Sequence, residues 1–214
     1  RFGKAGRSLF QAFAGILAQT QLDAQRYRSL GVKQVEIVGN LKFDVPLDPS
    51  LVQQGKSWKQ ELHAEQRLMV CAASTRDGEE AIILKAWKDL LLSNTFDIAP
   101  LLCLVPRHPE RFSEVANQIH GSGLKFRRRT EWMGTPKIDL GVDVILGDSM
   151  GEMSMYYSAA DLVVMGGSLL PFGGQNLIEA CAAGCPVLLG EHTYNFQQAT
   201  LDAIEMGAAK RIRG

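Results

Sequence analysis

The sequence predicts an α/β protein built on a Rossmann-like parallel sheet with helices on both faces. From about Glu65 to Gly214, apolar runs of strand length alternate with segments of helical length. The runs are continuously apolar, which is typical of parallel strands that are covered on both faces. Polar or Gly-rich segments follow these runs, and ligands of such sheets bind at the carboxyl ends of the strands.

The first part of the chain predicts a separate structural unit. The spacing of its apolar residues predicts one helix from Ser8 to Leu30, ended by Gly31 (Phe10, Phe13, Ile16 and Leu17). Val35–Val38 then reads as a short buried strand. The stretch GNLKFDVPLDPS, with two prolines and two aspartates, is typical of an inter-domain linker. We therefore assign residues 1–45 to the end of one domain plus a linker, and residues 46–214 to the Rossmann-like domain.

The second part begins with a bridging helix near residues 51–62. The strands that follow are predicted at 67–74, 99–106, 142–148, 161–167 and 186–190, and the helices at 77–92, from 107 onward, 149–159, 176–183 and 196–206. Asp148 or Ser149 is available to cap the helix at 149–159. The short run Arg127–Arg129 is interpreted as a solvated edge.

Composition excludes several classes of function. The chain has 23 basic and 23 acidic side chains, which is unlike the basic footprint of a nucleic-acid binder. No apolar stretch is long enough to cross a bilayer, and we expect neither a membrane span nor a signal peptide. The four cysteines are expected to be buried reduced thiols. A metal site built on Cys181, Cys185 and His192 is the weaker alternative.

The Gly-rich segment at residues 166–174 is the strongest indication of a ligand site. Its glycines, including Gly173 and Gly174, permit close backbone approach and positive φ, so that the bare backbone could receive a phosphate. Asn176 and Glu179 follow three residues apart and can face one ligand. A carboxylate there suits the two hydroxyls of a ribose. The alternative is a capped helix that packs tightly on the sheet.

Three other strand ends carry polar residues. Pro106, Arg107 and His108 follow one buried strand, and Arg107 could pair with a phosphate or carboxylate. Met150, Gly151 and Glu152 open the helix after another strand. A third group, Ser74 and Thr75 with Arg76 beside them, could cap a helix or bind an anion. For the segment 106–111, the alternative is an exposed helix entry with surface charges.

Taken together, the motifs resemble the lipopolysaccharide Kdo (3-deoxy-D-manno-octulosonic acid) transferases, which are two-domain GT-B glycosyltransferases. The resemblance covers nearly the whole chain and rests on AQTQLDAQRYRSLGV, VEIVGNLKFD, STRDGEE, PRHPERF, GDSMGEM, GGSLLPFGGQNLIEA and GEHTYNFQ. It implies the donor-binding half of the enzyme, truncated at its C-terminus, with the end of the acceptor half before it. The implied activity is the metal-independent, inverting transfer of Kdo from CMP-Kdo to a lipid A precursor, without a cofactor.

The resemblance also implies which residues bind the donor. The CMP site would consist of Pro106, Arg107, His108, Met150, Gly151, Glu152, Asn176, Leu177, Ile178 and Glu179, and further donor contacts could come from Ser74, Thr75, Gly173 and Gly174. The family commonly has His at the positions of Arg76 and Gln175, so these two receive no role. The family's general base is a glutamate upstream of Arg1, and no catalytic residue is assigned here.

The resemblance implies a place of action at the cytoplasmic face of the Gram-negative inner membrane, with membrane contact only through the missing half. Two other functions remain open. A GT-B-type nucleotide-sugar epimerase also uses a Gly-rich loop and a ribose-binding carboxylate, and a non-catalytic nucleotide-binding module is compatible with half of an enzyme. Formation of lipid-linked Kdo by the complete protein separates the first function from the other two.

Overall fold

The computed structural model describes residues 4–39, 47–131 and 140–213. The chain divides into two compact units, Arg1–Pro46 and Leu47–Gly214, and each is described by itself. Residues 40–46 of the predicted linker lie outside the described residues.

The first unit is a small parallel βαβ arrangement. It contains α1 (Lys4–Gln11), β1 (Ile16–Ala18), α2 (Gln21–Ser29) and β2 (Val35–Ile37). β1 and β2 pair in parallel, with Ile16 opposite Val35. The prediction of one helix over residues 8–30 was therefore wrong, because a strand interrupts it.

A capping signal explains where the second helix starts. The Thr20 hydroxyl accepts a hydrogen bond from the Asp23 backbone N–H at 3.1 Å and donates one to the Asp23 carboxylate at 2.7 Å. This Thr-x-x-Asp pattern marks a helix N-terminus, which the spacing of the apolar residues alone had concealed. The apolar triplet 16–18 before it is then free to pair as a strand.

The second unit is a seven-stranded parallel sheet of order β5-β6-β4-β3-β7-β8-β9, which confirms the predicted fold class. Its strands are β3 (Met69–Thr75), β4 (Leu101–Pro106), β5 (Phe126–Arg128), β6 (Val144–Leu146), β7 (Leu162–Met165), β8 (Val187–Leu189) and β9 (Ala209–Arg211). Its helices are α3 (Pro49–Ala64), α4 (Glu79–Leu92), α5 (Phe112–Ser122), α6 (Met153–Ala159), α7 (Ile178–Ala182) and α8 (Gln197–Glu205). Short 3-10 helices cover Pro109–Arg111, Arg129–Glu131 and Tyr194–Phe196.

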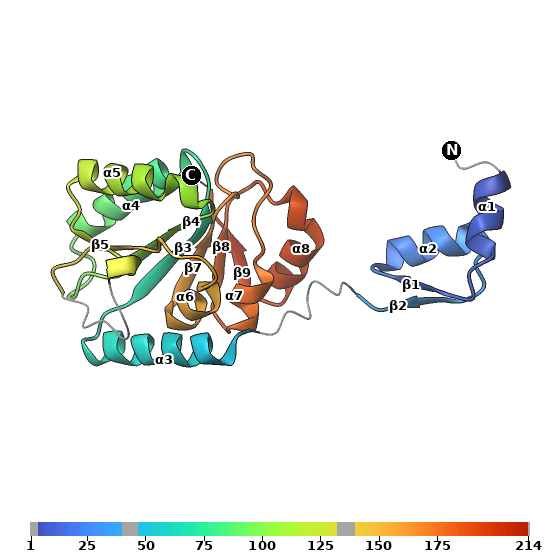
Figure 1. Ribbon diagram of the computed structural model, residues 1–214, viewed down its shortest axis with the longest axis horizontal. Helices are drawn as coiled ribbons and strands as arrows, with labels where there is room; N and C mark the ends of the chain where they lie inside the picture. The colour runs from blue at the N-terminus through green and yellow to red at the C-terminus, as the bar shows by residue number, and fades with distance from the viewer. Residues whose placement is uncertain (1–3, 40–46, 132–139, 214) are drawn as a thin grey trace. The chain divides into compact units, whose positions relative to one another are not determined.

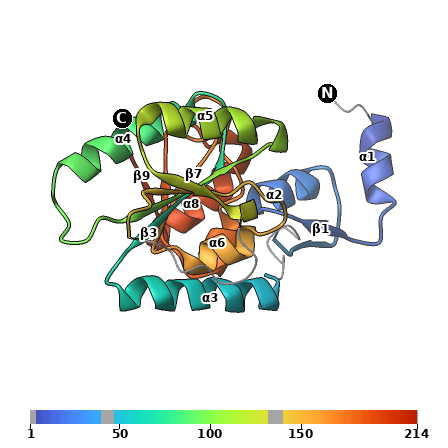
Figure 2. The same cartoon turned by 60° about the vertical axis from the view of Figure 1, so that its left-hand side comes forward.

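Helices cover both faces of this sheet (Figures 1 and 2). α4 and α5 pack on one face, where side chains such as Trp87 and Ile119 meet alternate residues of β4 and β6. α3, α6, α7 and α8 pack on the other face, around Trp58 and Tyr156. Because successive side chains of a strand point to opposite faces, two cores explain why the strands are continuously apolar.

All seven strands run in one direction, so their carboxyl ends meet at one edge of the sheet, here called the carboxyl edge. Five of the segments at this edge are 74–78, 106–108, 147–152, 166–177 and 190–195. The opposite, amino edge carries Asp161, whose carboxylate accepts from the Met69 backbone N–H and from Lys59 and His63 of α3. None of the helices in the described parts of the chain combines the length and the hydropathy needed to cross a bilayer.

Candidate functional site

The Gly-rich loop, residues 166–174, leaves β7 in close contact with β3. The Gly166 backbone N–H donates to the Ala73 carbonyl at 2.8 Å. A Cβ atom at Gly166 would lie 2.3 Å from the Ser74 carbonyl oxygen, so only glycine fits. Ser74 itself has a φ of 55°, and the pairing of β3 with β4 shifts register between Ala73 and Thr75. The end of the central strand is thus shaped around the start of the loop.

The far end of the loop is held by the segment after β8. Gly173 has a φ of 93°, and a Cβ there would lie 2.4 Å from the side-chain nitrogen of Asn195. The Asn195 backbone N–H donates to the Gly173 carbonyl, and the Tyr194 hydroxyl donates to the Pro171 carbonyl. Gly173 has the positive φ that was predicted for these glycines, and the group that approaches its backbone closely is the Asn195 side chain.

A buried carboxylate that the sequence did not single out binds the middle of the loop. Glu79 is fully buried at the start of α4 and accepts hydrogen bonds from the backbone N–H groups of Gly167, Leu169 and Leu170. The Gly174 N–H donates to the Gly167 carbonyl. The prediction of a bare backbone that offers its N–H groups to a phosphate was therefore wrong at these positions.

Asn176 and Glu179 lie together just after the loop. The Asn176 side-chain N–H donates to Glu179 Oε1 at 3.2 Å, and its side-chain oxygen accepts from the Ile178 N–H at 3.1 Å. Both side chains are half-buried and Leu177 is buried. α7 begins at Ile178 and not at Asn176 as predicted, because the Asn176 side chain binds the backbone two residues on. The amide and the carboxylate of the pair thus hold each other.

At the end of β6, Glu152 is the centre of a polar cluster. It accepts from Arg129 at 2.8 Å, from the Ser149 hydroxyl and from the Tyr156 hydroxyl at 3.5 Å. Met150 is 59% exposed, and Gly151 has a φ of 80°. α6 begins only at Met153, without a side-chain cap, so the predicted cap by Asp148 or Ser149 was wrong.

Asp148, which was expected to cap α6, has other partners. Asp148 accepts from the Thr130 backbone N–H and hydroxyl and lies 3.4 Å from Arg128. Burial is the largest cause that raises the pKa of Tyr156 above its ordinary value, so its hydroxyl is a neutral donor. Arg129 is buried, and the interpretation of Arg127–Arg129 as a solvated edge was wrong for this residue.

The segment after β4 places one exposed arginine at the carboxyl edge. Pro106 is buried, Arg107 is exposed and His108 is half-buried. The Arg107 backbone N–H donates to the Thr75 carbonyl at 3.0 Å, which joins the ends of β3 and β4. Within the described residues the Arg107 guanidinium has no carboxylate partner, so its charge is available to a ligand.

Thr75 has an internal partner. It is buried, and its hydroxyl donates to the Glu80 carboxylate at 2.8 Å, which also accepts from Arg111 at 2.7 Å. Burial acts to lower the pKa of Arg111, but the hydrogen bonds and charges of Glu114 and Glu80 outweigh it and raise that pKa. Thr75 therefore supports the entry to α4, and Ser74 beside it is half-buried.

The two positions at which the chain departs from the resembling family both touch the Gly-rich loop. The Arg76 guanidinium lies 4.9 Å from the centre of the Phe172 ring. The Gln175 side chain lies 3.1 Å from the position that a Cβ on Gly167 would take. Neither residue is remote from the candidate site.

The structure thus places all the predicted segments at the carboxyl edge. β3 and β4 meet through Thr75 and Arg107, and β3 and β7 meet through Ser74 and Gly166. Glu179 lies near Tyr157 of α6. Burial is the largest cause that raises the pKa of Tyr157, followed by the nearby Cys71 and Glu179.

Among the described residues, no three His, Cys, Asp or Glu side chains are grouped as metal ligands. Cys71, Cys103 and Cys185 are buried.

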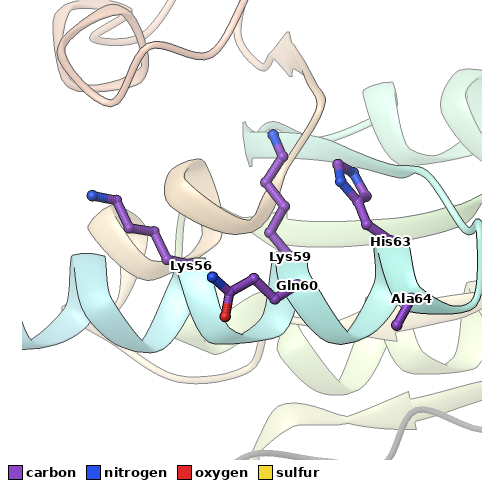
Figure 3. A pocket seen from close by; sticks show the side chains of 5 residues that line it. All are labelled: Lys56, Lys59, Gln60, His63 and Ala64. Atoms are coloured by element: carbon purple, nitrogen blue, oxygen red, sulfur yellow. The ribbon is translucent and has the colours of Figure 1, made fainter.

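A hollow at the amino edge offers a different kind of surface. It has a volume of about 540 Å³ and lies along α3, lined by Lys56, Lys59, Gln60, His63 and Ala64. Figure 3 shows Lys59 and His63 rising from the same side of the helix. Both side chains are bound to Asp161, so they serve the junction of α3 with the sheet, away from the Gly-rich loop.

Comparison with known proteins gives consistent matches. A family model described as 3-Deoxy-D-manno-octulosonic-acid transferase (kdotransferase) matches residues 1–45. The chain is 44% identical over 212 residues to a 3-deoxy-D-manno-octulosonic acid transferase of Bordetella pertussis. This match covers 98% of this chain and 48% of the relative. It is 37% identical over 208 residues to the enzyme of that name from Haemophilus influenzae, covering 92% of this chain and 46% of the relative. The chain thus spans about half the length of the curated relatives it matches.

A solved structure matches the second unit. It is the C-terminal CMP-Kdo binding domain of WaaA from Acinetobacter baumannii, with 32% identity and a TM-score of 0.70, covering 78% of this chain and 83% of that domain. The match extends over most of that domain at an identity that implies common descent. The chain therefore belongs to the 3-deoxy-D-manno-octulosonic acid (Kdo) transferase family.

Proposed function

We propose that this chain is the donor-binding part of a glycosyltransferase that transfers Kdo from CMP-Kdo to a lipid A precursor. The observation that carries the proposal is the match of the sheet domain to a domain described as binding CMP-Kdo. The similarity to Kdo transferases over 98% of the chain supports it. We also propose that residues 1–45 are the end of the acceptor domain, which the family match to these residues supports.

The donor site that we propose lies at the carboxyl edge. Glu179, which is held by a hydrogen bond from the Asn176 side chain, accepts hydrogen bonds from the ribose hydroxyls, because an ionised carboxylate is an acceptor only. The segment 106–108 and the segment 150–152 enclose the nucleotide from the other strand ends. Leu177 and Ile178 line the same site, and Gly173, Gly174, Ser74 and Thr75 border it.

The phosphate is assigned to a different part of the backbone than the sequence indicated. Within the described residues, the backbone N–H groups of Gln175, Asn176 and Leu177 donate to no protein acceptor. Together with the exposed Arg107, they supply donors and positive charge for a phosphate. No metal ion is part of this proposal, since these groups can balance the charge of a single phosphate.

The reaction that we propose is the attack of an acceptor hydroxyl on the anomeric carbon of Kdo, with inversion and with CMP as the leaving group. Arg107 and the N–H groups stabilise the charge that develops on the phosphate. No residue of this chain is proposed as the general base. The resemblance gives that role to a glutamate of the acceptor domain, so we expect this chain to bind the donor without transferring Kdo. The proposed place of the whole enzyme is the cytoplasmic face of the inner membrane.

A calorimetric titration tests the nucleotide assignment. With EDTA present, CMP should bind this chain more tightly than UMP. Binding that requires a divalent metal, or equal affinity for CMP and UMP, would contradict the proposed site.

A second experiment tests the reaction. Incubation of the complete protein with CMP-Kdo and a lipid A precursor should yield lipid-linked Kdo. An epimerase would convert a nucleotide sugar without the lipid, and a non-catalytic module would bind the nucleotide and convert nothing.

A further inference from the structure

We infer that Glu79 is a positioning residue that holds the Gly-rich loop, residues 166–174, in the shape that the donor requires. This inference rests on the proposed function in one respect, namely that the loop borders the donor. Neither the family resemblance nor the comparisons assign a role to this glutamate.

Both carboxylate oxygens of Glu79 are used. Oε2 accepts from the Arg76 N–H at 2.8 Å and from the Gly167 N–H at 2.7 Å. Oε1 accepts from the Leu169 N–H at 2.9 Å and from the Leu170 N–H at 3.3 Å. One side chain therefore connects the entry to α4 with three backbone groups of the loop, 88 to 91 residues further along the chain.

The environment makes this connection strong. Glu79 has no exposed surface, so its four hydrogen bonds do not compete with water. Hydrogen bonds to a charged group are also stronger than those between neutral groups. An unpaired carboxylate at this depth is costly, so the N–H groups must stay directed inward to satisfy it.

The loop is fixed from two further directions. Ser168 is buried, accepts from the Gly190 N–H at 2.8 Å and donates to the Met165 carbonyl. The segment 194–195 holds the loop's far end. Glu79 fixes the middle of the loop. The loop ends at Gly174 and continues directly into the segment 175–177, to which we assign the phosphate. A shift of the loop must move that segment.

A glutamine at position 79 separates this role from general stability. Glu79→Gln keeps the size of the side chain, but it directs an amide N–H₂ at one of the two pairs of backbone donors. We expect the loop to move and the affinity for CMP to fall tenfold or more, at a temperature where the variant is fully folded. Hydrogen exchange of the Gly167, Leu169 and Leu170 amides should accelerate more than exchange in β3 and β4.

Asp161→Asn is the matched control. Asp161 is likewise a carboxylate that accepts a backbone N–H, from Met69, but it is only partly buried and lies at the amino edge. This control should lose stability, keep its affinity for CMP and keep slow exchange of the loop amides.

The outcomes decide between the two roles. Unchanged CMP affinity of folded Glu79→Gln, or equal loss of affinity in both variants, would overturn the inference. If Glu79→Gln does not fold, Glu79→Asp keeps the charge but shortens the reach, and the same two measurements apply. If the unmodified chain does not bind CMP, the proposed function fails, whereas the exchange data still show whether Glu79 holds the loop.

Discussion

Arg129 and Glu152 form an ion pair of 2.8 Å, and the Arg129 guanidinium also lies 5.6 Å from the centre of the Trp58 ring. Only 10% of the arginine side chain and 20% of the glutamate side chain are exposed. The ion pair joins the residue after β5, at the edge of the sheet, to the segment 150–152. It therefore connects a structural arginine to a carboxylate that we place in the donor site.

Removing that arginine should reorient Glu152. We expect Arg129→Met to lower the affinity for CMP about tenfold, or about 1.4 kcal/mol. The half-buried Glu152 carboxylate would lose its cation and would turn toward water or another donor. Arg129→Lys should restore part of the affinity. Arg127→Met, at an exposed neighbour, is the control, and calorimetry of the three variants checks the prediction. Equal binding by Arg129→Met and Arg127→Met would contradict it.

Glu179→Gln tests the ribose contact. The glutamine oxygen can still accept from Asn176, but the side chain loses its charge. Hydrogen bonds to a charged group contribute about 1.5–3 kcal/mol, so CMP affinity should fall roughly ten- to a hundredfold. The melting temperature should change little, because a glutamate in a first helical turn contributes about 0.3–1 kcal/mol. If the residue is merely a structural cap, melting will change and affinity will not; Glu205→Gln, at the exposed end of α8, is the control.

Two glycines with positive φ separate crowding from backbone strain. Gly173→Ala must adopt a φ near 93° and must displace Asn195, whereas Gly184→Ala has a φ of 74° and meets nothing within 4 Å. The second change should cost about 1–2 kcal/mol of unfolding free energy. The first should cost more and should also weaken CMP binding. Denaturant unfolding and calorimetry measure the two effects, and equal behaviour of the variants would show that the Asn195 contact is unimportant.

The amino edge predicts a dependence of stability on pH. Partial burial acts to raise the pKa of Asp161, but the Met69 N–H, then Lys59 and His63, outweigh it and hold that pKa below its ordinary value of 3.8. A lowered pKa in the folded state means that the carboxylate stabilises the fold above pH 3.8 and that this stabilisation is lost as the pH falls through the folded value. Asp161→Asn should therefore be less stable at pH 7, and the difference should vanish in strong acid. A difference that grows toward low pH would contradict this assignment.

The central strands could be predicted from the sequence, and the edge strands could not. β4 is buried throughout, and its apolar run LLCLVP identifies it at once. β5 reads FRR and β9 reads AKR, because edge strands pair on one side only and carry charges that discourage further pairing. In the first unit the apolar spacing fitted a helix as well as a strand. Only the Thr20 cap distinguishes the two.

The candidate site was predictable in its place but not in its connections. The topology of a parallel sheet brings the strand ends together, so the segments could be named from their order alone. Glu79 lies in the first turn of α4, where a helix dipole favours any acidic residue, so its place in the sequence does not reveal a further role. Its partners in the Gly-rich loop lie 88 to 91 residues away in the chain, and no local pattern encodes them. Arg129 was missed for the same reason.

The hydrogen bond from Gly167 to Glu79 spans 88 residues, and this distance along the chain has a kinetic consequence. Contacts between distant segments form late in folding, because closing a long loop costs entropy before the contact can stabilise it. β3 must pair with β7 before the loop can take its bound shape. In refolding experiments, the ability to bind nucleotide should therefore recover no earlier than the burial of Trp58 and Trp87, and added ligand should slow unfolding more than it speeds refolding.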